Sequence, residues 1–267
     1  MSSEKRVRLA ATDLDGTLVR SDGSLSERTQ RALLAVEAAG VEVVFVTGRP
    51  LRWAREVFDH VGGHGLAVVS NGALVWDVAT ESVHLHRPIP VDVGLEVCAR
   101  LRAAVPGTAF GVESLEGLTL EPEFLERHPI PPGVRRGHVT ETFDQPAVKI
   151  LARHEDLEAE EFWDLALEAV GDLATITWSS ASALLEISAA GVTKATTLAL
   201  LCEARGISPE EVVAFGDMPN DLPMLEWAGS SYAMANAHLT VLAAARATTL
   251  SNDEDGVAVV LEGLLGD

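Results

Sequence analysis

The sequence predicts an α/β protein in which a parallel β-sheet has helices on both faces and is interrupted by a second, α+β domain. Short apolar runs alternate with helical patterns over residues 7–70, and this alternation returns over residues 193–265. Between them, residues 85–188 hold eight of the 12 prolines and a different mixture of helices and strands. We therefore expect residues 1–84 and 189–267 to form one domain, with residues 85–188 inserted into it.

Hydrophobic spacing and breaker residues place the individual elements. Apolar side chains at helical spacing predict a helix over residues 27–39 that ends at Gly40, and a continuous β-branched run predicts a central strand over residues 41–46. The same criteria predict core strands at 7–12, 66–70, 212–215, 232–235 and 247–250, and core helices at 52–61, 193–205, 222–227, 238–245 and 256–265. In the inserted region they predict helices at 93–104 and 157–170, and strands at 109–112, 148–152, 174–178 and 184–187.

The chain carries 40 acidic and 20 basic side chains, which gives a formal net charge of −20. This charge argues against nucleic acids and membrane surfaces as partners, because both attract positively charged proteins. A phosphorylated substrate would also be repelled unless a metal ion and a few cationic side chains reverse the potential locally. Apolar runs fall short of the roughly 18 residues that span a bilayer, and the N-terminus shows no signal peptide. We therefore expect a cytoplasmic protein that is a monomer or a weak homodimer.

The run Asp13-Leu14-Asp15-Gly16-Thr17 directly follows the first predicted strand. Open parallel sheets place their sites at the carboxyl ends of strands. Two carboxylates two residues apart, with a glycine that lets the backbone approach an anion, suit a metal ion and phosphoryl transfer. The alternative is a calcium-binding EF-hand loop, which needs glycine where Leu18 stands, a carboxylate or amide where Thr17 stands, and a preceding helix. The chain meets none of these three requirements.

Two further segments offer groups that bind anions. Thr47-Gly48-Arg49 follows a buried strand, and its hydroxyl group and the amides that open the next helix form an anion site. By itself, such a turn is more often an ordinary strand-to-helix connection. Lys194 lies at the N-terminal end of a predicted helix, where a cation opposes the helix dipole. An anion bound nearby would offset that conflict.

Gly216-Asp217-Met218-Pro219-Asn220-Asp221 follows another apolar strand. We expect Asp217 at the tip of this strand, with Asn220 and Asp221 capping the helix that starts at Leu222. Capping explains one of the acidic residues, but it does not explain why three polar groups converge on the end of one strand. The segment therefore indicates a functional site.

Taken together, these motifs resemble those of the haloacid dehalogenase superfamily, and more closely those of its Cof-type phosphatases, which carry a large cap between the second and third motifs. The resemblance covers nearly the whole chain and rests on the order and spacing of Asp13-x-Asp15-Gly16-Thr17, Thr47-Gly48-Arg49, Ser70-Asn71-Gly72-Ala73, Lys194 and Gly216-Asp217-x-x-Asn220-Asp221. It implies a Rossmann-like three-layer α/β/α core with an inserted α+β cap domain. One departure is Ala195, where the family commonly has glycine.

The resemblance also implies roles for the acidic residues. Asp13 would attack phosphorus and form an aspartyl-phosphate, while Asp15 would protonate the leaving oxygen and later activate water. Mg²⁺ would be held by the Asp13 carboxylate, the Asp15 main-chain carbonyl and Asp217, and Asp221 would support these ligands. An acid at Asp15 argues against halide displacement, in which the leaving group needs no proton.

Other residues of the motifs would contact the substrate. By the same resemblance, the phosphoryl oxygens would be bound by Thr47, Gly48, Lys194 and Asn220. The candidates for contact with the rest of the substrate are Arg49, Asn71 and Gly72. For Asn71-Gly72 a second interpretation stands beside this one, because an Asn-Gly pair between apolar runs is the strongest short signal for a β-hairpin.

These residues favour a Mg²⁺-dependent hydrolase of small phosphate monoesters, such as sugar phosphates or phosphorylated cofactors. A phosphosugar mutase would use the same Asp13 and Asp15 and return the phosphoryl group to a sugar, and sequence motifs alone do not separate the two. A non-catalytic phosphosugar-binding protein is a third hypothesis. The presence of every expected acid counts against it, because closely spaced carboxylates are electrostatically costly. The inserted domain does not name the substrate.

Overall fold

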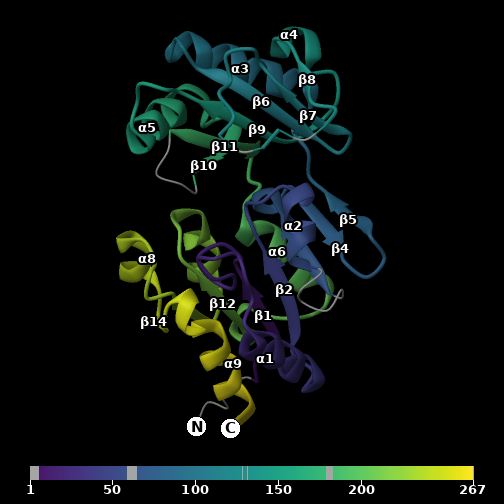
Figure 1. Ribbon diagram of the computed structural model, residues 1–267, viewed down its shortest axis with the longest axis vertical. Coiled ribbons are helices and arrows are strands. Elements are labelled where there is room, and N and C mark those ends of the chain that lie inside the picture. Colours follow the sequence, from purple (N-terminus) through teal and green to yellow (C-terminus); the bar gives the residue numbers. More distant parts are fainter. Residues whose placement is uncertain (1–5, 59–64, 128, 131, 179–182, 267) are drawn as a thin grey trace. The chain divides into compact units, whose positions relative to one another are not determined.

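Figure 1 shows a computed structural model of the chain, in which residues 6–58, 65–127, 129–130, 132–178 and 183–266 are described. Internal contacts divide the chain into two compact units. Unit 1 consists of Met1–Leu85 and Thr193–Asp267, and unit 2 consists of His86–Val192. Within the described residues, no helix combines the length and the apolar character that crossing a membrane requires.

Unit 1 is built on an eight-stranded sheet. Its strands are β1 (Leu9–Thr12), β2 (Glu42–Val46), β3 (Leu66–Val69), β4 (Leu74–Asp77), β5 (Ser82–His86), β12 (Val212–Gly216), β13 (Ser230–Ala233) and β14 (Ala247–Thr248). Their order in space is β14-β13-β12-β1-β2-β3-β4-β5. Each neighbouring pair from β14 to β3 is parallel, whereas β4 is antiparallel to β3. The predicted parallel sheet is therefore confirmed, with a hairpin added at one side.

Helices flank this sheet and complete a three-layer α/β/α core (Figure 1). Among these helices, α1 (Glu27–Ala38) packs against α9 (Gly256–Gly266), and α6 (Lys194–Ala204) packs against α7 (Leu222–Trp227). Further helices of unit 1 are α2 (Leu51–Phe58) and α8 (Leu239–Ala244), with single 3-10 turns at Ser70–Gly72, Pro209–Glu211, Pro219–Asp221 and Asn252–Glu254. This layering confirms the predicted Rossmann-like core.

The N-terminus of α6 is fixed by a reciprocal cap between two threonines. Thr193 Oγ1 accepts a hydrogen bond from the Thr196 N–H at 3.0 Å, and Thr196 Oγ1 accepts one from the Thr193 N–H at 3.0 Å. At the other end of α6, Gly206 adopts a left-handed φ of +59°, which closes the helix. Lys194 is therefore held as the first residue of a helix with well-defined ends.

Unit 2 contains a six-stranded sheet. Its strands are β6 (Ala109–Ser114), β7 (Gly117–Leu120), β8 (Arg135–Arg136), β9 (Ala147–Arg153), β10 (Ala174–Thr177) and β11 (Leu184–Ala189), in the order β10-β11-β9-β6-β7-β8. The pairs are antiparallel from β10 to β7, and β7 runs parallel to β8. Two helices, α3 (Val91–Ala104) and α5 (Ala159–Val170), pack against each other, and the short α4 (Val139–Thr142) packs on β6. Unit 2 is thus an α+β unit.

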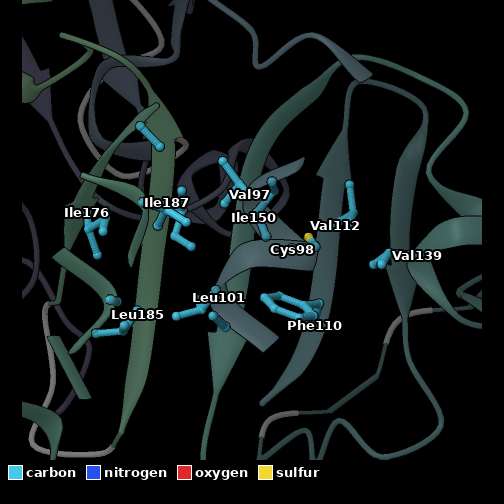
Figure 2. Packing of buried hydrophobic residues seen from close by; sticks show 14 of the residues in the cluster. Val97, Cys98, Leu101, Phe110, Val112, Val139, Ile150, Ile176, Leu185 and Ile187 are labelled. Atoms are coloured by element: carbon cyan, nitrogen blue, oxygen red, sulfur yellow. The ribbon is translucent and has the colours of Figure 1, made fainter. Parts of the chain in front are cut away.

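The main core of unit 2 joins its helices to one face of its sheet (Figure 2). The residues labelled there come from α3 (Val97, Cys98, Leu101), β6 (Phe110, Val112), α4 (Val139), β9 (Ile150), β10 (Ile176) and β11 (Leu185, Ile187). A second, smaller cluster contains Ala109 and Leu151. In the sequence these residues are next to Phe110 and Ile150, which belong to the first cluster. Because successive side chains of a strand point to opposite faces, this sheet buries apolar residues on both sides.

A buried carboxylate holds the irregular segment after β7 in place. Glu121 accepts hydrogen bonds from the Phe110 N–H at 2.9 Å and the Val139 N–H at 3.1 Å, and it forms an ion pair with Arg102. These contacts use both carboxylate oxygens, so the buried charge is paired and hydrogen-bonded. They connect α3, β6 and α4 through one side chain.

The structure contains elements that the hydrophobic pattern did not predict: β4, β5, β7, β8 and α4. Several of these are short or lie toward the side of a sheet, and β5 and β8 expose many of their side chains. Apart from β4, whose residues Leu74–Trp76 are apolar and buried, these elements lack the long apolar runs on which the prediction depended. The hairpin signal at Asn71-Gly72 did indicate one of these elements, because an antiparallel hairpin connects β3 and β4. The predicted helix over 52–61 ends at Phe58, and its last predicted residues lie outside the described part of the chain.

Gly94 lies inside α3, where alanine would ordinarily favour the helix by roughly 0.5–1 kcal/mol. A Cβ atom here would lie 2.3 Å from Cζ of the buried Phe143 ring. We therefore expect Gly94→Ala to lower the free energy of unfolding by about 1–3 kcal/mol, measured as a lower Tm in calorimetry. Gly263→Ala in α9 is the matched control, because its Cβ would meet no described atom within 4 Å. Equal shifts of Tm in the two variants would contradict this account.

Candidate active site

The polar motifs follow four strands that lie side by side in the sheet of unit 1. Asp13 follows β1, Thr47 follows β2, Ser70 follows β3, and Asp217 follows β12. Because these four strands are parallel, the four positions lie along the same edge of the sheet. The fold therefore brings together motifs that are far apart in the sequence.

Lys194 joins two of these motifs through buried ion pairs. Its Nζ atom lies 2.6 Å from Asp13 Oδ1 and 2.6 Å from Asp221 Oδ1, and its side chain is only 1% exposed. Burial raises the pKa of the Asp13 carboxyl well above its usual range, and the ammonium group of Lys194 opposes this shift. Burial also disfavours the charged form of Lys194, but the two carboxylates raise its pKa above the usual value. The helix dipole alone does not set the charge of this lysine, because two anions contact it directly.

Asp217 completes a cluster of three buried carboxylates. One oxygen from each of Asp13, Asp217 and Asp221 lies within 4.8 Å of the others. Asp217 Oδ1 accepts a hydrogen bond from Thr17 Oγ1 at 3.0 Å, across 200 residues of sequence. Burial raises the pKa of Asp217 to about 7, and the charge of Asp221 adds to this effect. Within the described residues, this is the group of acidic side chains that could hold a metal ion.

The predicted capping role of Asp221 is wrong. Among the described residues, its side chain makes no capping hydrogen bond to α7; instead, Oδ2 accepts from the Asp217 and Met218 N–H groups, both at 3.0 Å. Asn220 is also turned away from such a cap, since its Nδ2 donates to Asn71 Oδ1 at 3.1 Å. The 3-10 turn Pro219–Asp221 precedes the helix, and it directs both side chains back toward the strand ends.

Asp15 lies in a different environment from Asp13, although only one residue separates them. Its carboxylate is 57% exposed and receives two hydrogen bonds from Arg49, with Nε at 2.7 Å from Oδ2 and Nη2 bonded to Oδ1. This is a bidentate contact, which fixes both the distance and the plane of the carboxylate. Arg49 also donates its backbone N–H to Thr47 Oγ1 at 3.0 Å. The structure therefore links the first and second motifs through Arg49.

The segment Ser70-Asn71-Gly72 forms a tight turn against the second motif. The Ser70 N–H donates to Arg49 O at 2.9 Å, and the Asn71 N–H donates to Thr47 O at 3.1 Å. On its other side, Gly72 O accepts from Thr197 Oγ1 of α6 at 2.7 Å. The turn thus connects the end of β2 to the helix that carries Lys194.

Comparison with known proteins identifies the family to which these motifs belong. Residues 10–261 match the sequence model of the haloacid dehalogenase-like hydrolases. The chain belongs to this family. Two Bacillus subtilis relatives are 5-amino-6-(5-phospho-D-ribitylamino)uracil phosphatases: YcsE is 30% identical over 94% of this chain and 93% of its own, and YitU is 28% identical over 97% and 98%. The crystal structure of SMU.1108c from Streptococcus mutans UA159 is 25% identical, with a TM-score of 0.87 over 98% of this chain and 100% of the other.

Membership in the haloacid dehalogenase-like hydrolases confirms the resemblance seen in the sequence motifs. It makes the chain an enzyme of the phosphatase class, as its relatives are named. The structure brings Asp13, Lys194, Asp217 and Asp221 into one buried cluster. Five further predicted residues make two sets of contacts, Asp15 with Arg49 beside Thr47 and Asn71 with Asn220, while Gly72 O accepts from Thr197 Oγ1.

Two features of this site were missed by the sequence analysis. Thr17 was identified only as the end of a motif, yet its hydroxyl group holds Asp217. Gly16 was expected to let the backbone approach an anion, and the described atoms nearest to its Cβ position belong to the Asp217 carboxylate. A Cβ atom on Gly16 would lie 2.3 Å from Asp217 Oδ2. The residue types of the motif gave no sign of this contact, because it depends on the distance between the ends of two strands.

Gly16→Ala should displace Asp217 and lower kcat/KM for a phosphate ester by at least about 100-fold, since small misplacements at a site are costly. Gly16 also has a left-handed φ of +70°, which alanine adopts at a cost in stability. Gly23→Ala is the matched control, because Gly23 has a similar φ of +83° and no described atom within 4 Å of its Cβ position. Steady-state kinetics and Tm should show a loss of stability in both variants, but a loss of activity only in Gly16→Ala. Full activity in Gly16→Ala would show that catalysis does not depend on the close approach of Gly16 to the Asp217 carboxylate.

Proposed function

We propose that this phosphatase hydrolyses small phosphate monoesters with Mg²⁺, through an aspartyl-phosphate formed on Asp13. The observation that supports it best is the buried network in which Lys194 Nζ lies 2.6 Å from both Asp13 and Asp221, beside the Asp217 carboxylate. Such a network holds the Asp13 carboxylate in one orientation at the end of its strand. A fixed carboxylate next to other acids and a cation suits attack on a phosphoryl group.

The acidic cluster has the composition expected of a Mg²⁺ site. Its carboxylates supply the hard oxygen ligands that Mg²⁺ prefers. With its three carboxylates ionised beside one lysine, the cluster carries two net negative charges, which a divalent cation balances. Asp13, Asp217 and the main-chain carbonyl of Asp15 would hold the ion, which would neutralise charge on the phosphoryl group.

The contacts of Asp221 support a role beside this ligand set rather than within it. One of its carboxylate oxygens accepts from Lys194, and the other accepts from two backbone N–H groups. Both oxygens are thus engaged by hydrogen-bond donors. In our proposal, Asp221 orients Lys194 and the backbone of Asp217, and so positions the groups that bind the ion and the substrate.

In the first step, a carboxylate oxygen of Asp13 forms a bond to phosphorus while the bond from phosphorus to the ester oxygen breaks. The leaving oxygen takes a proton from Asp15. The Asp15 carboxylate is bound to Arg49 in this structure, so proton transfer requires it to leave that contact. Its exposure leaves room for such a rotation. Arg49 would therefore hold Asp15 as a carboxylate, and Asp15 would act as the acid only after it leaves this ion pair and takes up a proton.

In the second step, water attacks the phosphorus of the aspartyl-phosphate, and Asp15 takes a proton from that water. The bond from phosphorus to Asp13 breaks, which releases inorganic phosphate and regenerates the Asp13 carboxylate. During both steps, donors from Thr47, the Gly48 backbone, Lys194 and Asn220 would bind the phosphoryl oxygens. Thr47 and Lys194 belong to segments that the turn 70–72 connects.

The names of the relatives suggest the kind of substrate. YcsE and YitU act on a phosphorylated ribitylaminouracil, and an Escherichia coli relative, YbhA, is a pyridoxal phosphate phosphatase that is 28% identical over 94% of this chain. We propose a small phosphorylated metabolite of this kind, a sugar phosphate or phosphorylated cofactor, as the substrate. Unit 2 would be the cap that discriminates between such molecules. The net charge of −20 favours a monomer or weak homodimer, because like-charged copies repel one another, and we propose a cytoplasmic location.

Asp13→Asn should abolish the release of inorganic phosphate from a panel of phosphate monoesters, lowering kcat by at least roughly 1,000-fold, because the nucleophile is lost. Phosphate released into water also separates a hydrolase from a mutase. Asp22→Asn is the control, since Asp22 is exposed and its Oδ1 accepts from the Ser24 N–H, a contact that asparagine retains. Unchanged turnover in Asp13→Asn would exclude the covalent mechanism.

Removing metal ions with a chelator should abolish activity, and Mg²⁺ should restore it. A ligand at 100 times its Kd stabilises a folded protein by about 2.7 kcal/mol, so saturating Mg²⁺ should raise Tm by on the order of 5–10 °C. Asp217→Asn should remove most of this rise, whereas Asp22→Asn should keep it. The measurement is differential scanning fluorimetry of chelator-treated protein across a Mg²⁺ titration. An equal rise in the Asp217→Asn variant would place the ion elsewhere.

A further inference from the structure

The backbone of the turn Ser70-Asn71-Gly72 adopts an unusual conformation. Three successive residues have positive φ angles: +50° at Ser70, +54° at Asn71 and +104° at Gly72. Residues other than glycine rarely adopt this region, and asparagine does so more readily than most. Such conformations persist where the surroundings determine them, and they concentrate at functional sites. Here the surroundings are the backbone of the second motif on one side and α6 on the other.

The turn places the Asn71 side chain against Asn220. Asn71 is 1% exposed, and its Oδ1 accepts a hydrogen bond from Asn220 Nδ2 at 3.1 Å. The turn cannot shift easily toward α6, because a Cβ atom on Gly72 would lie 2.3 Å from Thr193 O. Asn71 is therefore a buried acceptor held in a fixed position by backbone contacts on both sides.

This acceptor determines which end of the Asn220 amide points toward Asn71. An amide carries two N–H donors on its nitrogen and an acceptor oxygen, and the two ends have nearly the same shape. Asn71 Oδ1 attracts the nitrogen end and repels the oxygen end. Asn220 Oδ1 is buried and has no hydrogen-bond partner among the described residues. Without Asn71, little in this part of the chain would favour one orientation of the amide over the other.

We propose that Asn71 is a positioning residue, which orients the Asn220 amide so that its nitrogen presents a hydrogen-bond donor to a phosphoryl oxygen. The inference rests on the proposed function, in which Asn220 binds the phosphoryl group. It assigns Asn71 a role different from direct contact with the substrate, which the sequence left open. The same turn contacts the second motif and the helix that carries Lys194. It therefore also fixes the position of the Asn220 amide relative to Thr47 and Lys194.

A double-mutant cycle tests this role. We expect Asn71→Gly to lower kcat/KM for p-nitrophenyl phosphate about tenfold, as loss of one orienting hydrogen bond would, and Asn220→Ala to lower it about 100-fold. Glycine suits the left-handed backbone at position 71, so this variant removes the amide without straining the turn. If Asn71 acts through Asn220, the double variant should match Asn220→Ala within about twofold. A purely structural role of Asn71 would lower activity in both backgrounds.

The matched control is Glu81→Gly, which also replaces a residue with positive φ, +48°, but at an exposed position between β4 and β5. It should leave kcat/KM unchanged. Multiplicative effects in the double variant, close to 1,000-fold in total, would overturn the inference, as would wild-type activity in Asn71→Gly. The same cycle on the Kd of inorganic phosphate, measured by calorimetry with Mg²⁺, decides the question without turnover. A wild-type chain that binds phosphate with the expected coupling but releases none from esters would refute the proposed function alone.

Discussion

Lys194 Nζ contacts a carboxylate oxygen of Asp13 and another of Asp221, each at 2.6 Å, and all three side chains are buried. Burying charges costs free energy unless each one is paired and hydrogen-bonded. Asp221 meets this condition with two backbone N–H groups, and the cap at Thr193 fixes the lysine itself. The ammonium group therefore ties the ends of β1 and β12 to α6. The motifs after β2 and β3 depend on this connection through their neighbours, because β2 lies beside β1 in the sheet, β3 lies beside β2, and Gly72 O accepts a hydrogen bond from Thr197 of α6.

Glycines allow the motifs to approach this cluster more closely than side chains would permit. A Cβ atom on Gly16 would lie 2.3 Å from a carboxylate oxygen of Asp217, and one on Gly216 would lie 2.8 Å from a carboxylate oxygen of Asp221. Gly72 approaches the cap of α6 in the same way. Two of these three glycines, at positions 16 and 72, also have positive φ angles. The glycines of the motifs are thus required by packing around the acids as well as by backbone conformation.

The sequence predicted the sheet and the gathering of the motifs because both depend on local patterns. Buried parallel strands are continuous apolar runs, and polar residues at their carboxyl ends must share an edge. The sequence pattern did not predict contacts between side chains and segments that the fold brings together from different parts of the chain. Asp221 has the residue type and position of a helix cap, but its carboxylate accepts hydrogen bonds from the backbone of Asp217 and Met218 instead. The contact between Asn71 and Asn220 joins segments 149 residues apart, and no spacing along the chain predicts it.

Asp13 and Asp15 show how one short segment can supply two kinds of carboxylate. Their side chains are 7% and 57% exposed, and each is paired with a different cation. The ion pair of Asp13 is buried, so it is shielded from salt and keeps the carboxylate in place. The pair of Asp15 with Arg49 is bidentate but partly exposed, so water and salt screen it and it can open more readily than the buried pair. A nucleophile must be fixed, whereas an acid that serves two steps must move between a leaving oxygen and a water molecule. The difference in burial fits this division of roles in the mechanism that we propose.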